Sequence, residues 1–111
     1  MATTPKAQNN YKKITKLDLS NQNLTSFPDY VFKMTNLRKL ILHNNHISKI
    51  PPQIKALSKL MVLDLSNNEL SIIGYQVLKL PKLKILNLCY NQIVCLPNGI
   101  KEVGIKQLLL S

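Results

Sequence analysis

The length and composition of the chain limit it to one small domain built mainly from aliphatic residues. Its 111 residues are 45% hydrophobic but only 5% aromatic, so leucine and isoleucine must form the core, and a second independent domain is excluded. Fifteen Lys and Arg against five Asp and Glu give a formal charge of +10. This charge attracts polyanions and acidic proteins in general and identifies neither.

Compartment is suggested by what the sequence lacks. No apolar run reaches the roughly 18 residues of a membrane span, and the polar start holds no signal-peptide stretch. The two cysteines, Cys89 and Cys95, form no CxxC pattern, which argues against a zinc knuckle and a disulfide framework. We therefore expect an intracellular, most simply cytoplasmic, protein with no membrane span.

Residues 1–13 are a polar lead or partial cap, in which Tyr11 can lie over the first repeat. After them the chain repeats every 23 residues, with units that begin at Ile14, Leu37, Leu60 and Leu83. Their openings are ITKLDLSNQNL, LRKLILHNNHI, LMVLDLSNNEL and LKILNLCYNQI. Each fits L-x-x-L-x-L-x-x-N-x-L, except that Gln22 replaces one asparagine. The pattern predicts four full units and a partial fifth that begins one residue early, at 14–36, 37–59, 60–82, 83–104 and 105–111.

The second half of each unit is equally regular. Three positions are always apolar: Phe27, Ile50, Ile73 and Leu96; Val31, Ile54, Val77 and Ile100; Met34, Leu57, Leu80 and Val103. A proline follows the first of these positions as Pro28, Pro51 and Pro97, whereas Gly74 replaces it in the third unit. We therefore expect the third unit to differ locally after its strand.

Residues 14–111 resemble the leucine-rich-repeat family, most closely its intracellular 23-residue type. The resemblance implies an α/β solenoid, a right-handed superhelix with a parallel concave β-sheet and short helical or irregular convex segments. The alternation in Leu63-Asp64-Leu65 agrees, because it places the leucines inside a half-buried strand and Asp64 outside.

Two further features concern the framework rather than binding. We expect a structural ladder of inward amides, which donate and accept hydrogen bonds where the chain leaves each strand: Asn45, Asn68 and Asn91. The fifth unit places Ile105, Leu108 and Leu110 at the C-terminal rung with no polar cap after them. This rung leaves three alternatives open: a longer parent protein, a partner over the rung, or self-association through it.

The outward strand residues define the concave face, which the resemblance implies is the surface that binds another protein. The candidate partner-binding residues are Arg38, Lys39, Ile41, His43, Met61, Val62, Asp64, Lys84, Ile85, Asn87 and Tyr90. Among them, Ile41, Met61, Val62 and Ile85 are expected to form an exposed apolar band ringed by charge. The predicted function is therefore that of a non-catalytic, protein-binding scaffold.

A second group of residues suggests an alternative. Basic residues that fall just before or at the start of a strand predict a basic ridge, to which Arg38, Lys39 and Lys84 also contribute: Lys12, Lys13, Lys16, Lys59, Lys82 and Lys106. Such a ridge fits a small basic subunit of a ribonucleoprotein or other polyanionic assembly. Because the ridge lacks aromatic stacking residues and glycine loops, nucleic acid is the less favoured partner.

Catalysis and cofactor binding have little support. The nearest approach to a triad is His43 beside Ser66, with Asp18 or Asp64 close by, on an open surface without oxyanion donors. No carboxylate pair converges on His43 and His46 to hold a metal, and the phosphate-binding glycine motifs are absent. The sequence predicts no catalytic residue, no metal site and no cofactor.

Overall fold

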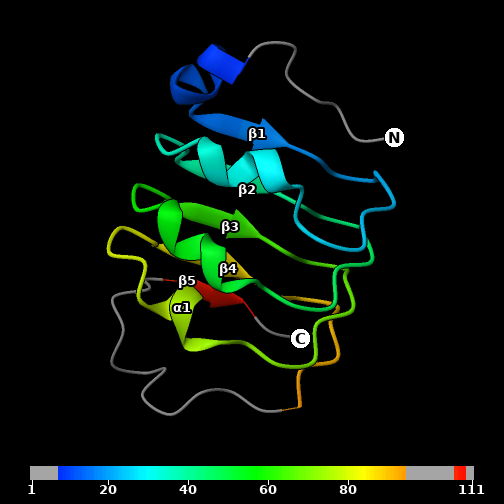
Figure 1. Cartoon of the computed structure of the whole chain (residues 1–111). Coiled ribbons are helices and arrows are strands. Elements are labelled where there is room, and N and C mark those ends of the chain that lie inside the picture. The colour runs from blue at the N-terminus through cyan, green and yellow to red at the C-terminus, as the bar shows by residue number, and fades with distance from the viewer. Residues whose placement is uncertain (1–7, 95–106, 110–111) are drawn as a thin grey trace.

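The computed structural model describes residues 8–94 and 107–109, with the side chains of 10–94. The chain forms a stack of rungs, with short strands on one side and short helical segments on the other (Figure 1). The strands are β1 (Lys16–Asp18), β2 (Lys39–Ile41), β3 (Val62–Asp64), β4 (Ile85–Asn87) and β5 (Gln107–Leu109). The helical segments are η1 (Gln8–Lys13), η2 (Asp29–Lys33), η3 (Pro52–Ala56) and α1 (Tyr75–Leu78).

The five strands form one parallel sheet in the order of the sequence, β1-β2-β3-β4-β5. Leu17 pairs with Leu40, which lies next to Leu63, so successive strands are offset by one repeat. The last step is shorter, because Leu86 pairs with Leu108, a separation of 22 residues (108 minus 86). The predicted start of the fifth unit, Ile105, lies outside the described residues.

The core runs between the sheet and the helical segments and consists almost entirely of leucine and isoleucine. The inward residues Leu40, Leu63 and Leu86 are fully buried, and so are the leucines that end each strand region. The predicted second-half positions are buried throughout units one to three, from Phe27 to Leu80. Their counterparts Leu96, Ile100 and Val103 lie outside the described residues, as do Cys95 and Pro97.

The segment opposite each strand depends on the residue before it. Pro28 and Pro51 fix φ at −62° and −74°, and 3-10 helices follow, with Val31 N–H donating to the carbonyl of Pro28. After Gly74 the chain forms a turn of α-helix, in which Lys79 N–H reaches the carbonyl of Tyr75. The local difference predicted for the third unit is confirmed.

The N-terminal rung is covered as the sequence suggested. In η1, Tyr11 is buried, and its ring stacks on that of Tyr30 with centroids 5.9 Å apart. The side-chain amide of Asn36 donates to the carbonyl of Lys12 over 2.7 Å, which ties η1 to the next rung. Tyr11 thus shields apolar surface of the first unit.

Candidate functional site

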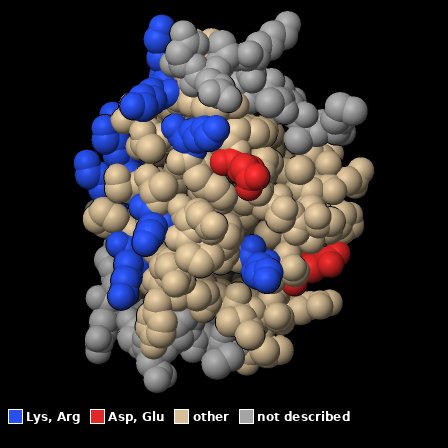
Figure 2. All heavy atoms as spheres, viewed as in Figure 1, with Lys and Arg blue, Asp and Glu red and all other residues tan. Residues whose placement is uncertain are grey.

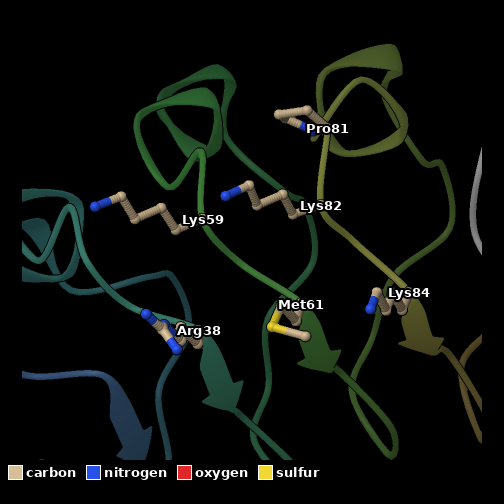
Figure 3. Close-up of a pocket in the computed structure, with 6 residues that line it drawn as sticks. All are labelled: Arg38, Lys59, Met61, Pro81, Lys82 and Lys84. Atoms are coloured by element: carbon tan, nitrogen blue, oxygen red, sulfur yellow. The ribbon is translucent and has the colours of Figure 1, made fainter.

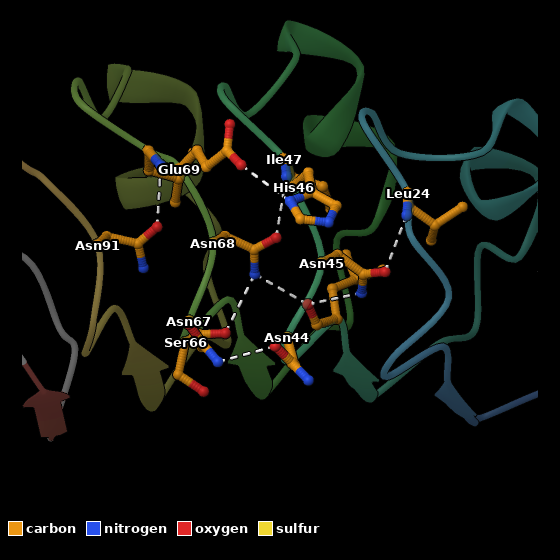
Figure 4. Close-up of polar contacts among 12 residues, drawn as sticks. Leu24, Asn44, Asn45, His46, Ile47, Ser66, Asn67, Asn68, Glu69 and Asn91 are labelled. Atoms are coloured by element: carbon orange, nitrogen blue, oxygen red, sulfur yellow. Dashed lines mark hydrogen bonds and ion pairs between the residues drawn. The ribbon is translucent and has the colours of Figure 1, made fainter.

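The turns that leave the strands are held by the predicted asparagine ladder. Asn68 donates to the carbonyls of Leu42 (2.9 Å) and Leu65 (3.1 Å) and accepts from Ile47 N–H (3.0 Å). Asn45 and Asn91 make the equivalent bonds one rung to either side (Figure 4). Each side chain uses both its donor and its acceptor on main-chain groups, so this inner ladder is part of the framework.

The residue before each inner asparagine forms a second ladder, which sequence reasoning did not find. Asn44 donates to Asn21, and Asn67 donates to Asn44 over 2.8 Å, a bond drawn in Figure 4. All three residues lie on the exposed side of the turn. All three residues adopt positive φ angles of 55–60°. Asparagine tolerates this left-handed conformation, so the Asn-Asn pairs in the second and third units were the available signal.

The fourth unit has Tyr90 in place of the asparagine of this outer ladder. Tyr90 occupies the position that Asn21, Asn44 and Asn67 hold in the other units and shares their backbone conformation, with φ at 59°. Positive φ is unusual for a bulky residue and strains the backbone. Its side chain is 72% exposed, so this strained backbone presents an aromatic group at the surface. Tyr90 was predicted as a partner-binding residue, and this environment suits that role.

The predicted apolar band is less exposed than the sequence suggested. Ile41, Met61, Val62 and Ile85 are each only half-buried, because side chains of strands about 4.8 Å apart cover one another. Val62 and Ile85 are direct neighbours, but Ile41 pairs with Asp64 and is therefore offset from them. Among residues 10–94, the strongly exposed large hydrophobic residues besides Tyr90 are Ile72, Tyr75 and Val94, outside the strands.

Two of the predicted binding residues also brace the turns. The carboxylate of Asp64 accepts from the N–H and hydroxyl of Ser66, and Asn87 accepts from Cys89 N–H over 3.1 Å. In the first unit Asp18 does the same with Ser20. The Ser20 hydroxyl and N–H, more than the nearby charges of Lys16 and His43, hold the pKa of Asp18 below its ordinary value.

His43 and Ser66 meet as the sequence suggested, without forming an activated nucleophile. Ser66 Oγ lies 2.7 Å from His43 Nδ1, but it donates its one proton to Asp64 over 2.6 Å. The imidazole must therefore donate to the serine oxygen instead of accepting its proton, which is the reverse of base activation. Ser66 is also buried. The three residues form a polar brace across two rungs.

The basic residues gather at the edge where the strands begin (Figure 2). Lys12 and Lys13 in η1 and Lys16 in β1 are exposed there. Lys106 lies outside the described residues. Further along this edge, predicted face residues and ridge residues line a single groove of about 540 Å³: Arg38, Lys59, Met61, Pro81, Lys82 and Lys84 (Figure 3). We call it the basic groove. The sequence placed Arg38, Lys59, Lys82 and Lys84 on the basic ridge and Met61 in the apolar band, and it made no prediction for Pro81.

Within 8–94 and 107–109, no three His, Cys, Asp or Glu side chains come together as a metal site. No helix in this part of the chain is long and apolar enough to cross a bilayer.

Comparison with known proteins identifies the fold. The chain is similar to a leucine-rich-repeat protein of Leptospira interrogans, at 27% identity and a TM-score of 0.69 over 100% of this chain and 35% of that one. It is similar to the ectodomain of the Arabidopsis thaliana receptor kinase SOBIR1, at 26% identity and 0.69 over 94% and 65%. An internalin from Listeria monocytogenes shares the fold, at 20% identity and 0.73 over 94% and 36%.

The chain therefore spans between about a third and two thirds of these structures. No curated protein matches it in sequence. The leucine rich repeat family does match, over residues 12–54 and 35–93, which together cover most of the chain. The protein thus belongs to the leucine-rich-repeat family, and this membership and its structural neighbours suggest a protein-interaction scaffold.

Proposed function

We propose that the chain is a non-catalytic scaffold that binds another protein through its sheet face, the outward side chains of the strands and of the turns that follow them. The contrast between inward and outward positions carries the proposal. The inward position is leucine in every strand, as in Leu40, Leu63 and Leu86. The next outward position changes from Ile41 to Asp64 to Asn87. A constant interior with a variable face is what a scaffold needs to present a specific surface.

The residues of the sheet face supply contacts of several kinds. Val62 and Ile85 offer apolar surface, Lys39 offers charge and Tyr90 offers an exposed aromatic ring. Their main chains are fixed by the sheet and the inner ladder, so little entropy is lost on binding. Five strands at about 4.8 Å span only about 19 Å across the sheet. A face this narrow offers less area than the roughly 800 Å² per partner of a standard interface. We expect modest affinity from this face alone.

Serine substitutions at Ile41, Val62 and Ile85 test the proposal. The matched control replaces three apolar residues outside the strands with serine: Ile72, Tyr75 and Val94. In affinity capture with mass spectrometry, we expect proteins retained by the native chain and the control to be lost from the sheet-face variant. Circular dichroism checks that both variants are folded. Equal capture by all three proteins would reject the sheet face.

The second candidate is a basic subunit of a ribonucleoprotein or other polyanionic assembly, and the basic groove is the observation that favours it. The salt dependence of binding separates the two candidates. Phosphate contacts weaken steeply between about 50 and 200 mM salt, whereas contacts centred on Val62 and Ile85 change little. The groove lining includes no aromatic side chain on which bases could stack, so we favour the protein-binding proposal.

A further inference from the structure

The basic groove lies at one edge of the sheet and is built from two sets of residues. Arg38, Met61 and Lys84 each immediately precede a strand and stand side by side on successive rungs (Figure 3). Lys59 and Lys82 come from the loops that lead into β3 and β4 (Figure 3). The recess is open, and its apolar parts are Met61 and Pro81.

The groove carries four positive charges and no negative one in its lining. The only ion pair among the described residues joins His46 to Glu69 elsewhere, so Arg38, Lys82 and Lys84 have no carboxylate partner in this part of the chain. Lys59 is held in place, because its Nζ donates to Asn36 Oδ1 over 2.7 Å. Like charges around a recess focus the field on whatever enters it. An anionic ligand is therefore expected.

The repeat sets the spacing of these charges. Arg38 and Lys84 are separated by two rungs, or roughly 10 Å at about 4.8 Å for each rung. A polyproline-type segment rises about 3.1 Å per residue and returns to the same side every third residue, after roughly 9 Å. Two acidic residues three positions apart therefore match the two cations. Between the cations lies Met61, whose flexible side chain adapts to an apolar neighbour.

We propose that the basic groove binds an extended acidic segment of another protein, with two carboxylates three residues apart on Arg38 and Lys84 and an intervening apolar side chain on Met61. The guanidinium of Arg38 can donate two parallel hydrogen bonds to one carboxylate, which favours this pairing. The groove adjoins the sheet face, because Met61 and Lys84 directly precede Val62 and Ile85, but its lining includes none of the three residues changed in the sheet-face serine variant. Its binding is tested without reference to that face.

Fluorescence anisotropy with labelled peptides tests the proposal on the full chain. One peptide of about ten residues carries the sequence Glu-Leu-Pro-Glu between glycines and serines, and its partner has the same composition with the two glutamates adjacent. We expect the spaced peptide to bind about fivefold more tightly at about 50 mM salt, because only it reaches both cations. An oligouridine and vesicles containing phosphatidylserine are the competing probes.

The charge requirement is measured with paired variants. Arg38→Glu with Lys84→Glu should weaken binding of the spaced peptide about tenfold, since each reversal replaces an attraction to a carboxylate by a repulsion. The control, Lys33→Glu with Lys55→Glu, makes the same charge change in η2 and η3, where both lysines are exposed. The control should stay within about twofold of the native affinity. Met61→Ala should weaken the spaced peptide more than the adjacent one.

Several results would overturn the proposal. These are equal binding of the two peptides, equal loss in the two charge variants, or tighter binding of oligouridine or vesicles than of the spaced peptide. The sheet-face serine variant should bind the spaced peptide normally. Failure of peptide binding leaves the sheet-face result intact, and loss of capture by the sheet face leaves the groove intact.

Discussion

Two ladders of asparagine run through the same turns and differ in their burial and in their hydrogen-bond partners. The inner ladder, Asn45, Asn68 and Asn91, is largely removed from solvent and bonds main-chain groups of neighbouring rungs. The outer ladder, Asn21, Asn44 and Asn67, is exposed, and its members bond one another. One residue along the chain separates them. Burial, and not residue type, decides which ladder the fold depends on.

The comparison also shows where the sequence is free to change. The inner position keeps its amide in every unit, with Gln22 in the first, where the buried Oε1 finds no hydrogen-bond partner among the described residues. The outer position has changed to Tyr90 in the fourth unit. Water replaces a lost bond on the outer side at little cost, so that side is available for binding.

Removing one amide from each ladder should give the largest contrast. Asn68→Ala leaves Ile47 N–H and the carbonyls of Leu42 and Leu65 without this partner inside the core. We expect a loss of about 3–5 kcal/mol in the free energy of unfolding, against about 1 kcal/mol for the control Asn67→Ala. Urea unfolding measures both, and similar losses would end the distinction between the ladders.

Replacing an amide by a carboxyl group tests the need for a donor. In Asn45→Asp, the two N–H groups that Oδ1 accepts keep their partner, but the carbonyls of Leu19 and Leu42 face an oxygen. We expect a loss of about 2–3 kcal/mol at neutral pH. Because the charged form is disfavoured, the folded-state pKa of the new carboxyl rises. The free energy of unfolding should therefore fall as pH rises from about 4 to 7.

The exposed Asn44→Asp is the control for this pH dependence. Its new carboxyl remains in water, so its unfolding free energy should change with pH in parallel with that of the native chain. If the unfolding free energy of Asn45→Asp changes with pH in the same way as that of Asn44→Asp, the position of Asn45 requires only a hydrogen-bond acceptor.

Tyr90→Asn gives the fourth unit the asparagine that the first three units have at this position. Asparagine fits the positive φ better than tyrosine and can continue the chain of bonds from Asn67, so stability should rise by about 1 kcal/mol. Asn67→Tyr should lower it by a similar amount. If Tyr90 serves binding, Tyr90→Asn should also weaken partner capture while the protein melts higher. Lower stability with unchanged capture would contradict both roles.

The smallest effect concerns Asp18. Ser20→Ala removes the hydroxyl that lowers the pKa of Asp18, so this pKa should move back toward 3.8 in a carboxyl titration by NMR. A carboxyl group whose pKa is lower in the folded state stabilises the protein at pH values above its unfolded-state pKa. This stabilisation is lost as pH falls through the folded-state pKa. The variant should therefore be slightly less stable near pH 6, and this deficit should shrink as pH falls through the folded-state pKa of Asp18. An unchanged titration would contradict the assigned cause.

The sequence predicted the repeat, the inward leucines, the inner ladder, the role of Tyr11 and the shift at β5, because period and alternation determine which side chains lie inside. It did not predict the outer ladder or the half-burial of Val62 and Ile85. Those depend on side-chain direction and on cover from adjacent rungs. The sequence predicted the basic ridge that Arg38 and Lys59 share, but not the groove that they line with Met61 and Pro81, because a groove depends on the shape of the loops before the strands.

Photo-crosslinking tests the central claim, that the sheet face is the binding surface. A photoreactive phenylalanine analogue is placed at Val62 in β3, or at Lys55 in η3 on the opposite side of the core (Figure 1). After irradiation in extract, the account predicts discrete crosslinked protein bands from position 62 and none from position 55. Bands from position 55 alone, or the same bands from both positions, would contradict it.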